Sequence, residues 1–107
     1  MKLNVFVAKN LYLGCTGQPI FDDHTAEAFQ KGLERQLMTC DEEKAFVHEN
    51  TVWYHLGSYD DETMKADFLS EPVLLVRCSD VLSQRRIKSK LIEEAKKKEG
   101  ELDDKVN

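Results

Sequence analysis

The chain has 107 residues, of which 41% are hydrophobic and 33% charged, and its formal net charge is −5. This length suits one domain with a single hydrophobic core, and no apolar run approaches the about 20 residues of a membrane span. The acidic balance excludes a protein that coats phosphates with its whole surface, because non-specific nucleic-acid affinity comes from neutralising phosphates.

The N-terminal segment is predicted to hold short strands and a loop. Leu3–Ala8 has the composition of a strand, and Leu11–Leu13 predicts either a second short strand or the cover of a sheet edge. The loop from Gly14 to Gly17 lacks the spacing of a phosphate-binding glycine motif. Ile20 and Phe21 follow a proline and are expected in the core.

A helix is predicted from Asp23 to Met38, because apolar residues recur there at three- and four-residue spacing. This stripe consists of Ala26, Phe29, Leu33 and Leu37. Asp23 is the predicted N-cap, since its carboxylate can accept hydrogen bonds from the free amides of the first turn. Residues 41–44 then predict a solvated link.

The central strand is predicted to begin near Thr51. Strict alternation places one set of side chains, Val52, Tyr54 and Leu56, on one face. The other face would then carry Trp53, His55, Gly57 and Tyr59. The acidic residues 60–62 predict a turn, because Asp side chains stabilise chain reversals. Ala66–Leu69 would return as the second strand of a hairpin, which Glu71 and Pro72 would end.

The C-terminal part is predicted to be a buried strand, Val73–Cys78, followed by a helix that starts at Ser79 or Ser83. The charge changes sign along the chain. Residues 1–84 carry 7 Lys and Arg against 14 Asp and Glu, whereas residues 85–107 carry 8 against 6. Gly100 is a predicted helix stop.

We therefore expect an α+β domain over residues 1–84, a basic C-terminal helix over 85–99 and a disordered tail over 100–107. The sheet should be small and mostly antiparallel, with three to five strands and one covering helix.

Candidate chemistry is sparse. Cys15, Cys40 and Cys78 are isolated and odd in number, and without a predicted signal peptide they indicate reduced thiols in a cytosol. The histidines share no metal-ligand spacing with these cysteines, and the acidic residues 60–62 lack the spacing of a calcium loop. We therefore expect no catalytic residue, no metal and no cofactor, and we interpret the chain as a non-enzyme.

One stretch resembles a known family. The order is MKLNVFVAKN, PIF before the helix, the block HENTVWYHLGSYDDET and then EPVLL. Residues 1–76 resemble the small non-structural protein of gokushoviruses, single-stranded DNA phages of the Microviridae. The matching positions are Ala26, Phe29, Tyr54, Leu56, Gly57, Tyr59, Asp60, Asp61 and Thr63. The sequence departs from the family pattern at two positions, where Glu49 replaces a proline and Met64 replaces the turn glycine.

The resemblance implies a protein of the bacterial host cytoplasm that acts at single-stranded DNA synthesis or packaging. Its partner would be single-stranded DNA or a phage or host replication protein, without a membrane, and a homodimer is possible. Met64 at a glycine position implies either strain or a differently shaped turn.

Two surfaces are candidates for this role. Aromatic side chains on sheets can stack on unpaired bases, and basic side chains contact phosphates. The predicted nucleic-acid-binding residues are Trp53, Tyr59, Arg85, Arg86, Lys88 and Lys90. The alternatives are cross-strand packing for the aromatic residues and a solvated helix face for the basic ones.

The competing function is an acidic protein-interaction module that docks on or inhibits a host or phage protein and touches no DNA. Its predicted partner-binding residues are Asp60, Asp61 and Glu62.

Overall fold

The computed structural model describes the backbone of residues 1–106 and the side chains of residues 1–99. The elements are β1 (Lys2–Asn10), β2 (Cys15–Thr16), β3 (Ile20–Asp22), α1 (Ala26–Thr39), α2 (Glu42–Phe46), β4 (Thr51–Asp60), β5 (Ala66–Arg77) and α3 (Cys78–Val106). All strand pairs are antiparallel, so the predicted α+β class is confirmed.

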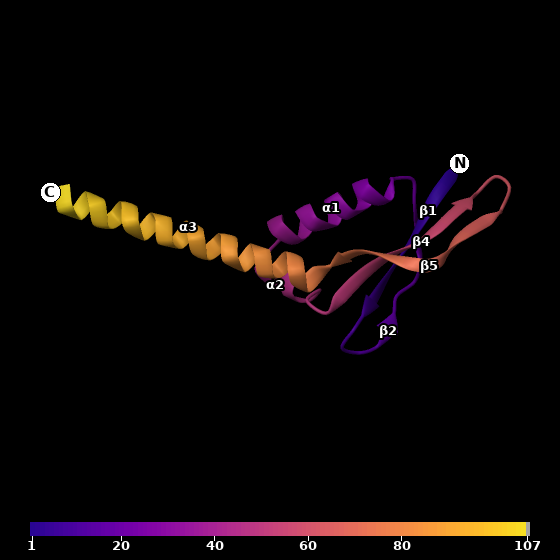
Figure 1. Cartoon of the computed structure of the whole chain (residues 1–107), viewed down its shortest axis with the longest axis horizontal. Helices are drawn as coiled ribbons and strands as arrows, with labels where there is room; N and C mark the ends of the chain where they lie inside the picture. The colour runs from indigo at the N-terminus through magenta and orange to yellow at the C-terminus, as the bar shows by residue number, and fades with distance from the viewer. Residues whose placement is uncertain (107) are drawn as a thin grey trace.

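The sheet is built on a long central pair, β1 with β4. Their register runs from Lys2 opposite Asp60 to Asn10 opposite Thr51. The strand order is β2-β1-β4-β5, and β3 also pairs with β1. Figure 1 shows the β4–β5 hairpin reaching to one end of the molecule, with α1 and α3 toward the other.

With Asp23 as its N-cap, α1 would begin at residue 24, but the helix begins two residues later, at Ala26. The Thr25 side chain caps it by accepting a hydrogen bond from the amide of Ala28 at 3.1 Å. The predicted capping role of Asp23 is therefore wrong. The preceding Asp22 carboxylate accepts from the amide of His24 at 2.7 Å, which holds the chain in a turn before the helix.

One part of the core lies between α1 and the face of the sheet that carries Phe6 and Trp53, and Val5, Val7 and Val52 are buried on the other face. The ring of Phe29 stacks on Phe6 with centroids 3.8 Å apart and meets Trp53 edge to face at 5.6 Å. A second cluster joins Leu37 to Val76 and to the start of α3. In the predicted stripe of α1, Leu37 is buried and the other three members are half-buried.

A bulge in β4 changes which side chains share a face. Val5 lies opposite Gly57 and Phe6 lies opposite His55, so Leu56 has no partner on β1. Strict alternation therefore fails at this residue. Trp53 faces α1, whereas Tyr59 packs edge to face on Phe21 of β3, with centroids 5.4 Å apart. The prediction that Trp53 and Tyr59 share one face is wrong.

Strand β5 continues past the proline that was expected to end the hairpin. Its register passes from Val73 opposite His55 to Phe68 opposite Gly57, so residues 69–72 form an irregularity and not an end. Of the expected buried strand Val73–Cys78, Val73 and Leu74 are exposed, Leu75 is half-buried and Val76 is buried, while the buried Cys78 already belongs to α3. The reason is position, because β5 lies at the sheet edge and pairs with β4 alone.

Two smaller expectations also fail. Leu11–Leu13 is a turn in which the side chain of Asn10 accepts from the amide of Leu13 at 2.9 Å. Ile20 and Phe21, expected in the core, lie in the short strand β3 and are 40% and 52% exposed. Residues 41–44 are exposed, as expected of a solvated link, and most of them belong to the short helix α2, in which Ala45 is fully buried.

Helix α3 starts at Cys78 and passes Gly100, the predicted stop. It extends away from the sheet and gives the molecule extents of 73 × 30 × 21 Å (Figure 1). The side chains of residues 100–107 are outside the part that the structure describes, so the disorder expected there stays a prediction.

Candidate nucleic-acid interface

The predicted residue Trp53 lies at the wall of a cavity. One part of its indole contacts Phe29 in the core, and the residue is half-buried. The cavity has a volume of about 390 Å³ and opens between α1, α2, the beginning of β4 and the beginning of α3. It is lined by Leu33, Gln36, Leu37, Cys40, Lys44, Val47, His48, Trp53 and Cys78.

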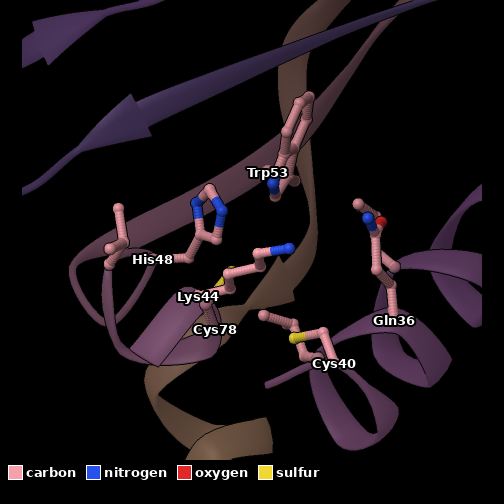
Figure 2. A pocket seen from close by; sticks show the side chains of 9 residues that line it. Gln36, Cys40, Lys44, His48, Trp53 and Cys78 are labelled. Carbon is pink, nitrogen blue, oxygen red and sulfur yellow. The ribbon is translucent and has the colours of Figure 1, made fainter. Parts of the chain in front are cut away.

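Polar groups from two helices and a turn surround this cavity. Figure 2 shows the amine of Lys44 reaching into the space between Trp53 and Gln36, with the ring of His48 beside it. Within residues 1–99, no hydrogen bond or ion pair involves the side chains of Lys44, Gln36 or His48. These three groups are therefore available to a ligand.

The cavity is locally cationic although the body is acidic. None of its lining residues is a carboxylate, and Lys44 is a formal cation. Cys78 adds no negative charge, because burial raises the pKa of its thiol to about 11. The guanidinium of Arg85 lies 4.0 Å from the sulfur of Cys40, at the same wall. An anionic group in this cavity meets positive charge.

The structure does not bring the two predicted aromatic residues together. Trp53 lies on the α1 face of the sheet, and Tyr59 lies on the opposite face near the β4–β5 turn. A single nucleotide cannot stack on both. Of the two, Trp53 is the one that lines a cavity with unpaired polar groups.

Two of the four predicted basic residues anchor α3 to the body. Arg85 donates to the carbonyl oxygen of Leu37 at 2.8 Å. Arg86 donates to the carboxylate of Glu49 at 3.0 Å, and its guanidinium lies 4.5 Å from the centroid of the Phe46 ring. These contacts hold the base of the helix in place, so both arginines have a structural role.

The other two basic residues are presented to solvent. Lys88 and Lys90 lie on the part of α3 beyond these anchors, and both are exposed. Within the described side chains, neither takes part in a hydrogen bond or an ion pair. Lys96, Lys97 and Lys98 lie further along the same exposed helix.

The acidic residues 60–62 form the β4–β5 turn. The Asp60 carboxylate accepts from the amides of Glu62 at 2.9 Å and Thr63 at 3.3 Å, and these bonds lower its pKa. The Asp61 carboxylate accepts from the ammonium group of Met1 at 2.6 Å. These predicted partner-binding residues thus have contacts within the chain.

A second group of acidic residues precedes α1. Ligand atoms of Asp22, Asp23 and His24 lie within 4.8 Å of one another. The backbone amide of His24 and, 2.5 Å away, Nδ1 of its ring both contact the Asp22 carboxylate and lower its pKa. The ring contact also raises the pKa of His24. The turn before the helix accounts for this geometry without a metal ion.

No protein-family model, curated protein or solved structure matches this chain. In the part of the chain that the structure describes, no helix is both long and apolar enough to cross a membrane.

The sequence did not identify Lys44, Gln36 or His48 as neighbours of Trp53. Lys44 is the only cation in the acidic segment 41–49, and that isolation is the one signal that was available. Its approach to Trp53 depends on α2, a five-residue helix whose formation follows from tertiary burial of Ala45.

Proposed function

We propose that this chain is a non-enzymatic accessory protein of a single-stranded DNA phage that binds single-stranded DNA. The phage context comes from the resemblance of residues 1–76 to the gokushovirus non-structural protein. The observation that carries DNA binding is the position of the α3 lysines. They lie on a helix that extends from the acidic body, so phosphates can approach them without passing close to its carboxylates.

The binding is electrostatic on α3 and independent of sequence. Lysine side chains act as point charges on phosphates, and each phosphate neutralised releases counterions. The cavity at Trp53 adds an aromatic surface next to the first residue of α3, Cys78. Stacking on such a surface contributes about 1–3 kcal/mol per base.

A salt titration with a short labelled single strand tests this function. The logarithm of the affinity should fall with the logarithm of the salt concentration, with a slope of about 0.7 for each phosphate contacted. Replacing both lysines, Lys88→Ser with Lys90→Ser, should weaken binding and flatten the slope. We exclude Arg85 and Arg86 from the test because both hold α3 on the body.

The matched control is Lys2→Ser with Lys65→Ser, which makes the same change in net charge on the body. This control should leave affinity and slope nearly unchanged. Absence of binding by the wild type at low salt, where phosphate contacts are strongest, would remove the proposal.

A protein-interaction module is the second candidate, and a specific observation favours it. Three apolar side chains of α3, Ile87, Leu91 and Ile92, are 60%, 60% and 48% exposed. Helices that bind protein grooves display such side chains at spacings of three and four residues. Light scattering of the purified wild type and of Leu91→Ala, each with and without the strand, tells whether this apolar surface mediates self-association.

A further inference from the structure

We propose that the cavity at Trp53 is a site for one nucleotide unit, with the base against the indole and the phosphate on Lys44 and His48. This inference rests on the proposed DNA-binding function and assigns residues that the sequence did not predict. The same chemistry is offered by a nucleotide within a strand and by a free nucleoside monophosphate, so the experiment includes both.

The size of the cavity sets the class of ligand. Small-molecule sites have volumes of about 300–1,000 Å³, and this cavity of about 390 Å³ lies near the lower limit. It accommodates a single base with its sugar and phosphate. It excludes a duplex, which makes the site selective for unpaired nucleotides.

The lining separates an apolar wall from polar groups, as a nucleotide requires. Trp53, Leu33 and Leu37 supply aromatic and aliphatic surface. The amide of Gln36 can donate and accept, which suits the edge of a base. A base in this position leaves water and stacks on the indole of Trp53, and such stacking is possible for every base.

The positive charge of Lys44 indicates where the phosphate of the nucleotide would lie in the cavity. The amine of Lys44 extends into the cavity (Figure 2), and His48 lies next to it on the α2–β4 segment. No carboxylate lines the cavity to oppose an anion. Hydrogen bonds between a cation and a phosphate are stronger than those between neutral groups, so Lys44 should decide the affinity for the phosphate.

The cavity also lies at the beginning of the basic helix. Cys78, the first residue of α3, is part of its wall. At 1.5 Å per residue, Lys88 is about 15 Å further along the helix axis. A strand with one base in the cavity can therefore continue toward the α3 lysines.

Intrinsic fluorescence tests the site directly, because Trp53 is the single tryptophan of the chain. Thymidine monophosphate and thymidine are titrated separately into the whole protein. Saturable quenching by the monophosphate is expected, with weaker binding of the nucleoside. Lys44→Gln should weaken binding of the monophosphate about tenfold and leave binding of the nucleoside unchanged.

Lys65→Gln is the matched control, since it removes the same charge at the β4–β5 turn, and it should bind the monophosphate as the wild type does. Lys44 is exposed, so its replacement should not affect folding, and circular dichroism checks this. Absence of saturable quenching by the monophosphate at millimolar concentration overturns the site. Equal monophosphate affinities of wild type and Lys44→Gln also overturn it.

The two proposals fail in different ways. If the labelled strand binds but the monophosphate does not quench Trp53, the cavity proposal is wrong and the α3 proposal stands. If the monophosphate quenches in a Lys44-dependent manner but the strand does not bind, the cavity is a site for free nucleotides and the DNA-binding proposal is wrong.

Discussion

Apolar side chains are buried in the body of the molecule but exposed on the outer part of α3. In the body, Phe6 and Val52 are 0% and 2% exposed within layers formed by the sheet and its helices. On α3 beyond Arg86, residues such as Leu91 remain 60% exposed. Cooperative packing therefore ends near Arg86, and the outer helix depends on its own propensity and on whatever it binds.

This difference separates stability from function. Substitutions in the body should change the free energy of unfolding, whereas substitutions on outer α3 should change binding and little else. Three substitutions, in order of decreasing change in stability, test this separation.

Phe6→Ala should destabilise the protein by about 3–5 kcal/mol, the usual loss for a buried phenylalanine. Phe6 is fully buried and stacks on Phe29, so the change removes the contact that joins β1 to α1. Urea denaturation followed by circular dichroism measures the loss. Phe21→Ala is the control, because Phe21 is 52% exposed; similar losses for both variants would contradict the position of the core.

Met64→Gly should stabilise the protein by about 0.5–1 kcal/mol. Met64 has φ of 59°, a left-handed conformation that costs a residue with a side chain about 1–2 kcal/mol, and the greater unfolded-state entropy of glycine offsets part of this gain. Thermal denaturation measures the change. Met64→Ala keeps the strain, and a gain equal to that of Met64→Gly would show that the backbone is not its cause.

Leu91→Ala should change the free energy of unfolding by less than about 0.5 kcal/mol, as is usual for exposed positions. Leu82, in the anchored part of the same helix, is 1% exposed, and Leu82→Ala should cost about 2–5 kcal/mol. Denaturation of both variants at one protein concentration gives the comparison. A large loss for Leu91→Ala would mean that outer α3 is packed against a partner.

The α+β class and the stripe of α1 could be predicted, because both follow from local periodicity. The turn at residues 60–63 could also be predicted, since the Asp60 side chain stabilises it locally. The exchange of faces within β4 could not, because a bulge at Leu56 depends on pairing with a strand about 50 residues away. The need for glycine at position 57 also depends on tertiary packing, because a Cβ there would collide with the backbone of Asp67 and Phe68 on β5.

The candidate site was predicted only in part. Trp53 was identified from its aromatic character on a strand, and Lys88 and Lys90 from their charge. The cavity was not predicted, because it is formed by segments that meet only after α1, α2 and the start of α3 pack together. Arg85 and Arg86 were predicted to contact DNA because of their charge, but both side chains are hydrogen-bonded to the body.

The outward course of α3 also determines how the protein diffuses. Its radius of gyration is 19.4 Å, whereas a compact chain of this length has about 13 Å. A particle of this shape meets more friction than a sphere of equal mass. The monomer will therefore leave a gel-filtration column early, at the volume of a heavier globular protein, and its stoichiometry with any ligand must be taken from measured mass.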